Sequence, residues 1–198
     1  MWRISSKACV PFAALLVACA SPSGTSGSAS ASGTASAAPV APKAELVTGE
    51  LMTTLSKFPE PLVASTVSPA TKGLVDGNVA FERELTGKRR FSPFHVFVCD
   101  GDCTLPFVEK LRGVAGAVRD EPFDLPDGRR GTVSGFSMFL GGGGVASVSK
   151  NGRYTLVVMM DLPPHDVEVE PDTRKFLDGA DPREVVLAVH RGLDKTLF

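Results

Sequence analysis

The composition of the chain changes abruptly at residue 43, and this change limits which part of it can fold. Residues 20–42 consist of Ala, Ser, Gly, Thr and Pro with a single Val and no charged residue. Such a segment lacks the periodic apolar side chains that a packed core needs, so we expect it to be disordered. The fold has to come from residues 44–198, which are long enough for a single domain with its own core.

The residues that precede this segment have the pattern of a secretory signal. Arg3 and Lys7 form a short basic start, no acidic residue occurs before residue 19, and residues 8–18 are mostly apolar. This order of charge and apolar length is typical of a signal peptide. An apolar stretch of about 11 residues is also too short to cross a bilayer, which takes roughly 20. We therefore interpret residues 1–18 as a removable segment.

The end of this signal resembles the lipobox of bacterial lipoproteins. It reads Leu16-Val17-Ala18-Cys19, with the cysteine directly after a small residue. The resemblance implies that Cys19 becomes the first mature residue and carries a thioether-linked diacylglycerol and, in many such proteins, an amide-linked third acyl chain. Two or more acyl chains anchor a protein stably, whereas a single chain binds marginally. The alternative is an ordinary signal peptide that contains Cys19, or a chance apolar start.

The same resemblance implies a location in the bacterial cell envelope, with the membrane as partner through the lipid on Cys19. Ala20 follows the cysteine, in place of the aspartate that retains some lipoproteins in the inner membrane. This favours the outer membrane, facing the periplasm or the cell surface. The chain then divides into a signal peptide (1–18), a lipidated cysteine with its linker (19–43) and a folded domain (44–198). A coil of this length and composition would hold the domain on the order of 25 Å from the membrane.

The mature chain is mildly acidic. Loss of residues 1–18 removes Arg3 and Lys7, so that 19 of the 21 basic residues remain against 22 acidic ones, a net charge of −3. This balance gives no electrostatic basis for binding nucleic acid. The short basic clusters Lys88-Arg89-Arg90 and Arg129-Arg130 adjoin glycines, and we interpret them as solvated loops rather than as a binding patch.

Apolar periodicity and turn residues predict a single α+β domain. Helices are expected at 48–57, 104–118 and 181–197, where capping residues or a first-turn proline precede an apolar face. Strands are expected at 62–66, 78–85, 94–99, 132–140, 145–150 and 153–161, with Asn151-Gly152 as a two-residue hairpin turn. This order predicts a mostly antiparallel sheet with two or three helices packed on one face.

Only two thiols remain in the folded domain, because Cys9 leaves with the signal and Cys19 is lipidated. Cys99 and Cys103 are separated by Asp-Gly-Asp and lie between a predicted strand and a predicted helix. In an oxidising compartment we expect them to form a disulfide that pins this corner. A redox pair, or a metal site completed by a histidine, are the alternatives. The spacing is not C-x-x-C, and the two aspartates disfavour a thiolate.

The histidines and glycines give no further signature. His95, His165 and His190 lack metal-ligand spacing, and we interpret them as surface or core residues. His95 is expected to share a strand face with Phe97 and Cys99. The run Gly141–Gly144 lies between predicted strands, so a flexible hairpin connection is preferred to a phosphate-binding loop, which leads from a strand into a helix.

The paired carboxylates are also interpreted structurally. Glu168 and Glu170 alternate with valines, which predicts a strand with both carboxylates on its solvated face. Asp100 and Asp102 flank the turn between the cysteines. None of these pairs implies general acid–base chemistry.

The sequence thus favours a membrane-anchored envelope lipoprotein whose domain binds or scaffolds another envelope protein, without enzymatic activity, cofactor or metal. The alternative is a thiol-redox or metal-handling envelope protein that uses Cys99 and Cys103.

Overall fold

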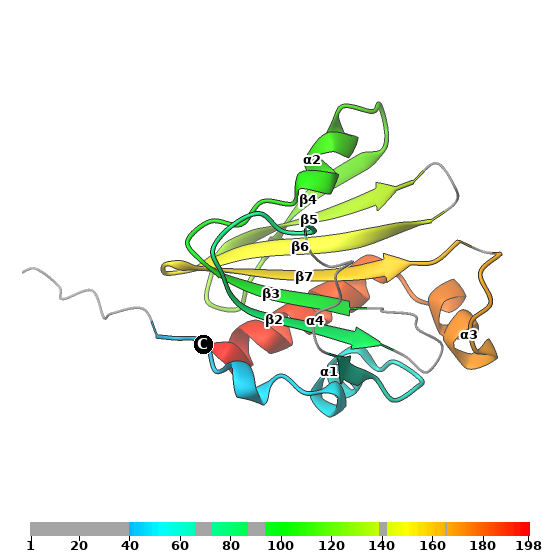
Figure 1. Cartoon of the computed structure of the whole chain (residues 1–198), viewed down its shortest axis with the longest axis horizontal. Helices are drawn as coiled ribbons and strands as arrows, with labels where there is room; N and C mark the ends of the chain where they lie inside the picture. The colour runs from blue at the N-terminus through cyan, green and yellow to red at the C-terminus, as the bar shows by residue number, and fades with distance from the viewer. Residues whose placement is uncertain (1–39, 66–72, 87–93, 139–141, 165) are drawn as a thin grey trace, which may run out of the picture. The chain divides into compact units, whose positions relative to one another are not determined.

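A seven-stranded antiparallel sheet forms the centre of the domain, with the strand order β1-β2-β3-β7-β6-β5-β4 (Figure 1). The strands are β1 (Val63–Ser65), β2 (Val79–Thr86), β3 (Phe94–Asp100), β4 (Val118–Asp124), β5 (Arg130–Ser137), β6 (Gly143–Asn151) and β7 (Tyr154–Leu162). This computed structural model describes residues 40–65, 73–86, 94–138, 142–164 and 166–198. The predicted signal, Cys9, Cys19, the linker up to residue 39, Lys88-Arg89-Arg90 and His165 lie outside these ranges.

Two meanders make up the sheet. The first runs from β1 through β2 to β3, and the second runs from β4 at the far edge through β5 and β6 to β7. The chain crosses from β3 to β4 by way of helix α2 (Pro106–Arg112). As a result β7, the last strand, pairs with β3 in the middle of the sheet, and this pairing joins the two meanders.

The other helices are α1 (Gly49–Ser56), α3 (Pro171–Gly179) and α4 (Pro182–Leu197), and a short 3-10 helix, η1 (Ala44–Leu46), precedes α1. The side chain of Thr48 caps α1 by accepting from the backbone N–H of Leu51. Asp181 caps α4 in the same way by accepting from the N–H of Arg183 at 2.9 Å. Both capped starts confirm the sequence-based helices, because a capping side chain satisfies a backbone donor that the first turn leaves unpaired.

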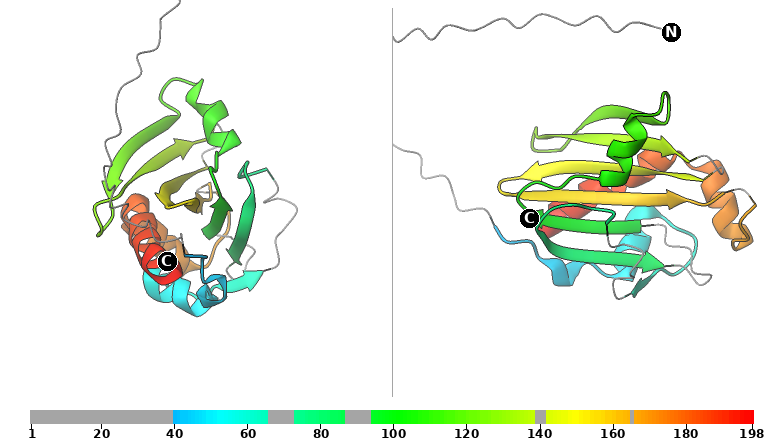
Figure 2. Two further views of the ribbon diagram at one scale, coloured as in Figure 1. Left: turned by 90° about the vertical axis from the view of Figure 1, so that its left-hand side faces the viewer. Right: turned by 45° about the horizontal axis from the view of Figure 1, so that its top comes forward.

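The sheet is covered on both faces, not on one face as the sequence predicted. One face packs against α1 and α4 in the main core, where Val96, Val98, Leu156 and Val158 meet Val189 and Leu193. The opposite face packs against α2 in a second, smaller core, where Phe97, Val157 and Met159 meet Val108 and Leu111. Figure 2 shows α4 and α2 on opposite sides of the sheet.

Helix α1 lies directly on α4 because of one glycine. A Cβ at Gly192 would lie 2.5 Å from a methyl carbon of Leu55, closer than real atoms approach. The absence of a side chain at this position lets the two helices meet, and Leu55 packs against the main core.

The structure corrects the second predicted helix. Helix α2 ends at Arg112 instead of residue 118, and Val118 begins β4, a strand that the sequence analysis did not predict. Its N-cap is Leu105, which has no capping hydrogen bond, rather than Thr104. Gly116 has φ +76, a left-handed conformation that a helix interior does not contain, and this turns the chain into the edge strand.

Three other local predictions are also revised. Residues 166–170 form turn and irregular structure in place of the expected strand, and they lead into the unpredicted helix α3. Asn151 pairs with Tyr154, so the hairpin turn consists of Gly152 and Arg153, one residue later than predicted. Gly143 and Gly144 belong to β6, so this half of the glycine run is strand and not a flexible connection.

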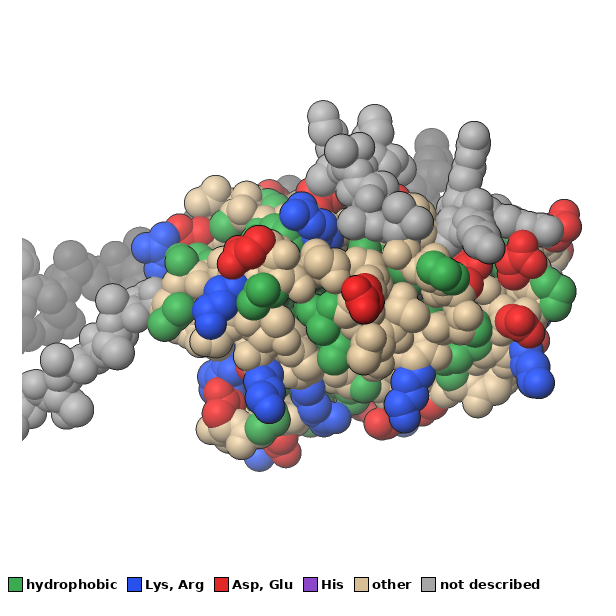
Figure 3. Space-filling view, turned by 90° about the horizontal axis from the view of Figure 1, so that it is seen from below, with side chains coloured by type: hydrophobic (Ala, Val, Ile, Leu, Met, Phe, Trp, Pro, Cys, Tyr) green, Lys and Arg blue, Asp and Glu red, His purple; other side chains and the backbone are tan. Residues whose placement is uncertain are grey.

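The described surface carries both signs of charge. Figure 3 shows the side of the domain that lies below in Figure 1, where basic, acidic and apolar side chains are interspersed. Among the described residues no helix is long and apolar enough to cross a membrane.

Candidate functional site

Polar side chains gather on the α2-covered face of the sheet, on strands β2, β3 and β7. Glu84 on β2 lies directly opposite His95 on β3, and His95 lies opposite Met159 on β7. Side chains two residues apart on a strand share a face, so Asp161 and Glu82 lie on this same side. We call the group of Glu82, Glu84, His95 and Asp161 the His95 site.

Asp161 orients the imidazole of His95. The Nε2 atom of His95 lies 2.9 Å from Oδ2 of Asp161, and the ring stacks on Phe97 with centroids 6.4 Å apart. His95 is 4% exposed, whereas the Asp161 side chain is 44% exposed. Because a carboxylate accepts hydrogen bonds, the proton of the neutral imidazole is assigned to Nε2, and in that form Nδ1 is an acceptor.

The remaining groups of the His95 site are also hydrogen-bond acceptors. The Nδ1 atom of His95 and Oε1 of Glu82 are buried without a hydrogen-bond partner among the described residues. Glu84 is 6% exposed and already has an interaction partner. Buried polar atoms are normally paired, so Nδ1 of His95 and Oε1 of Glu82 each require a hydrogen-bond donor, either ordered water or a ligand group.

The His95 site can hold a donor, and it contains the orienting half of an acid–base pair. A carboxylate that holds one imidazole nitrogen prepares the other to accept a proton or a hydrogen bond. In the described part of the chain, no group of three or more His, Cys, Asp or Glu side chains is arranged to hold a metal ion.

His95 shares a strand face with Phe97 and Cys99, as predicted, but its partners Glu84 and Asp161 were not predicted. Strands at 78–85 and 94–99 were both predicted, and pairing them as a hairpin would have set Glu84 across from His95. The hydrogen bond of Asp161 with His95 joins residues 66 positions apart in the chain and depends on the pairing of β3 with β7. Local periodicity carries no signal for that pairing.

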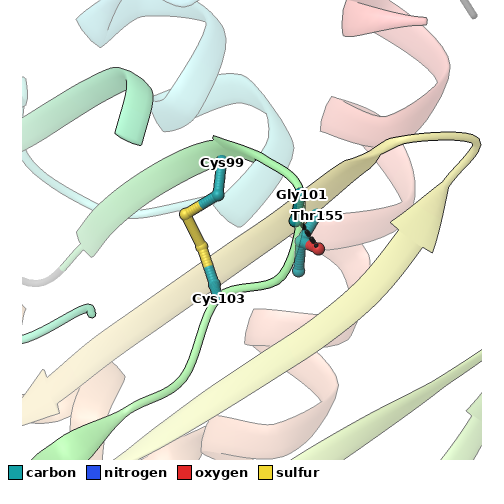
Figure 4. The surroundings of a disulfide bond; sticks show 4 residues. All are labelled: Cys99, Gly101, Cys103 and Thr155. Atoms are coloured by element: carbon teal, nitrogen blue, oxygen red, sulfur yellow. Dashed lines mark hydrogen bonds between the residues drawn. A yellow bond between two sulfur atoms is a disulfide. The ribbon is translucent and has the colours of Figure 1, made fainter. Parts of the chain in front are cut away.

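Cys99 and Cys103 are joined in the structure by a disulfide, with their Cα atoms 6.0 Å apart (Figure 4). Cys99 is fully buried. A Cβ at Gly77 would lie 3.4 Å from the sulfur of Cys99 and 2.7 Å from the carbonyl oxygen of Asp102, so the backbone of Gly77 lies directly against the bond. Access of a second thiol to the buried sulfur is therefore restricted, as in a structural disulfide.

The loop between the cysteines is fastened to the turn of the β6–β7 hairpin. The hydroxyl of Thr155 donates to the carbonyl of Gly101 at 2.6 Å, as Figure 4 shows. Asp100 pairs with Arg153, and Asp102 pairs with Lys150 at 2.5 Å. The carboxylates that flank the turn thus form ion pairs with the neighbouring hairpin.

His190 forms a second polar centre, on the face of the sheet that α4 covers. It is 0% exposed, with Ser147 Oγ 2.8 Å from Nδ1 and Ser149 Oγ 2.7 Å from Nε2. The Ser147 hydroxyl donates to the carbonyl of Val158, so it accepts from Nδ1–H, and Ser149 then donates to Nε2. Burial, with the nearby positive charges of Arg129 and Arg191, lowers the pKa of His190 to about 3.

Arg129 is part of this region rather than of a solvated loop, which corrects the sequence-based interpretation. Its guanidinium binds the nearly buried Asp194 at 2.5 Å, the carbonyl of Lys150 at 2.6 Å and Asp127. Burial alone would lower the pKa of Arg129, but the hydrogen bonds to Asp194 and Asp127 outweigh this effect and raise it. The ion pair fastens the β4–β5 turn to α4.

Described residues also line hollows of the surface, and none of these lining residues belongs to the His95 site. One, of about 250 Å³, lies between α3 and the start of β6, with Arg174 and Asp178 beside Leu162 and Pro163. Arg174 already donates to the carbonyls of Pro164 and Val167. Another, of about 400 Å³, is an open depression beside α3 at Phe176.

Comparison of the chain with models of known protein families, with curated proteins and with solved structures finds no match.

Replacing both Cys99 and Cys103 by Ala should lower the free energy of unfolding by about 2 kcal/mol, the chain-entropy value for a closed loop of about five residues. The contacts of the loop with Thr155, Lys150 and Arg153 remain, so the variant should still fold. Urea unfolding followed by circular dichroism measures the difference. Reductant should destabilise the wild type and leave the variant unchanged, and equal midpoints for oxidised wild type and variant would contradict a stabilising bond.

Acidification should destabilise the domain through His190. The unfolded chain binds a proton at this residue with a pKa of about 6.5, whereas the folded protein binds it only near pH 3. The stabilisation is therefore complete above about pH 6.5 and is lost as the pH falls towards 3, by about 2 kcal/mol between pH 7.5 and pH 5.

His190→Gln tests this linkage, because the amide can bond to the serines but does not titrate. The variant should be less stable than wild type at pH 7.5 and should lack this part of the pH dependence. Unfolding free energies at the two pH values, compared between the proteins, isolate the contribution of His190. Identical pH dependence in both would show that His190 does not enter the acid transition.

Proposed function

We propose that this chain is a lipid-anchored protein of the bacterial envelope, sorted to the outer membrane, whose folded domain binds another envelope component without catalysing a reaction. The observation that carries the proposal is the order of its segments: a basic start, a short apolar run, Leu16-Val17-Ala18-Cys19, an uncharged linker and then the folded domain. A short removable signal and a flexible spacer suit a domain that works while held close to a membrane.

The distribution of polar groups in the domain supports a binding role. Cys99 and His190 are buried among structural partners. The His95 site instead combines unpaired acceptor atoms with a carboxylate, Asp161, whose side chain is 44% exposed. An oriented set of acceptors with one exposed member is suited to recognition.

Cys19→Ala should abolish lipid attachment, because the thioether forms on this sulfur. Cells expressing the wild type or the variant are labelled with a radioactive fatty acid, and the immunoprecipitated protein is analysed by autoradiography and membrane fractionation. We expect label and membrane association for the wild type only.

Cys9→Ala is the matched control, since it removes the other N-terminal cysteine from within the apolar run. It should be labelled like the wild type. Label retained in Cys19→Ala would refute the lipid anchor.

Thiol-redox or metal-handling chemistry at Cys99 and Cys103 remains the alternative function. It requires that the bond opens easily or that the purified protein retains metal. We expect the native protein to resist alkylation under mild reductant and to take up two alkyl groups on these residues only after denaturation, as measured by intact mass. Rapid alkylation of the native protein, or stoichiometric zinc or copper by elemental analysis, would favour the alternative.

A further inference from the structure

We propose that the His95 site binds a cationic nitrogen group, an alkylammonium or a guanidinium, presented by the ligand of this domain. The inference rests on the proposed binding function and names the chemistry that the ligand must offer. The ligand can be a free amine or a basic side chain of a partner protein, since both present the same charged N–H donors.

The first reason is the hydrogen-bonding state of His95. Asp161 holds Nε2 at 2.9 Å, so in the neutral ring the other nitrogen, Nδ1, presents a lone pair. Nδ1 is buried and has no partner among the described residues. It needs a donor, and an N–H group supplies one.

The second reason is the charge of the neighbouring side chains. Glu82 on β2 and Asp161 on β7 place carboxylates on both sides of His95, whereas Glu84, directly opposite His95, already has an interaction partner of its own. Oε1 of Glu82 is a further buried acceptor without a partner in the described part of the chain. A donor that fills this face gains most if it carries positive charge, because hydrogen bonds between charged groups are the stronger ones.

The basic residue that follows Glu82 in the chain does not face the His95 site. Arg83 lies on the opposite face of β2, where its guanidinium sits over the ring of Phe81 at 4.9 Å. Phe81 belongs to the main core beneath α1 and α4. The alternation of β2 thus directs Arg83 away from the His95 site and both glutamates towards it.

An organic cation fits this arrangement better than a metal ion. The described His, Asp and Glu side chains do not converge in groups of three with the spacing of metal ligands. A guanidinium or alkylammonium group makes several separate hydrogen bonds and can bridge acceptors that are too far apart for one coordination sphere.

The test is a titration of the full-length protein in nonionic detergent, followed by isothermal calorimetry and by the NMR signals of the His95 ring. Agmatine and 1,4-diaminobutane are the cationic probes, and N-butylurea is a neutral probe that keeps planar N–H donors. We expect the cations to bind and to shift the His95 signals at concentrations at least tenfold below any effect of N-butylurea. Equal responses to the neutral and cationic probes, or no shift of His95 at roughly 50 mM probe, would overturn the proposal.

Glu82→Gln and Asp161→Asn should each weaken binding of agmatine by at least about fivefold, because each removes one negative charge from the site. Glu109→Gln is the matched control: it makes the same charge change on the exposed surface of α2, where Glu109 pairs with Arg112. Its affinity should stay within about twofold of the wild type. Circular dichroism verifies that each variant is folded, and unchanged affinity in both folded site variants would overturn the assignment.

Two further titrations, one with a peptide and one with zinc, distinguish the source of the cation and test for a metal. Tighter binding of the peptide Ac-Ala-Arg-Ala-NH2 than of agmatine supports a basic side chain of a partner protein, and the reverse supports a free amine. Zinc that binds with micromolar affinity and displaces agmatine would overturn the proposal in favour of a metal. Fatty-acid labelling of Cys19 does not depend on any of these results, so the anchoring proposal and the ligand proposal fail separately.

Discussion

The pairing of β3 with β7 is the interaction on which the rest of the structure depends. It joins two meanders that would otherwise be separate sheets, through six residue pairs from His95 with Met159 to Asp100 with Tyr154. Both strands are buried along most of their length, so the pairing also aligns the two cores on opposite faces. It brings Asp161 to His95 at one end and Arg153 to Asp100 at the other.

The two described histidines show how the environment sets the role of one residue type. His190 lies on α4 and has a serine hydroxyl of β6 on each ring nitrogen, so its hydrogen bonds are satisfied, and burial favours its neutral form. His95 has one nitrogen held by Asp161 and the other without a partner among the described residues. The first holds a helix on the sheet, and the second leaves bonding capacity for another molecule.

Helices were predicted correctly where several local sequence signals agree and incorrectly where these signals are weak or conflict. Helix α4 was predicted within one residue, because a cap, a first-turn proline and a long apolar face all agree there. Helix α2 was extended too far, since the apolar spacing continues past Arg112, where the helix ends, and the left-handed Gly116 then leads the chain into β4. Helix α3 was missed because it contains few apolar residues, Phe176 and Leu177, and because the preceding Glu–Val alternation has the pattern of a strand.

The residues alone specify the signal-like start, the uncharged linker, the capped helices, the hairpin strands and the close pair of cysteines, because each follows from side chains within a few positions of one another. The tertiary structure adds the partners of His95, the burial of His190 and the ion pair of Arg129 with Asp194. These depend on contacts between residues 41 to 66 positions apart. Such contacts form only when the sheet register and helix packing bring distant strands together, and no local period in the chain encodes that register.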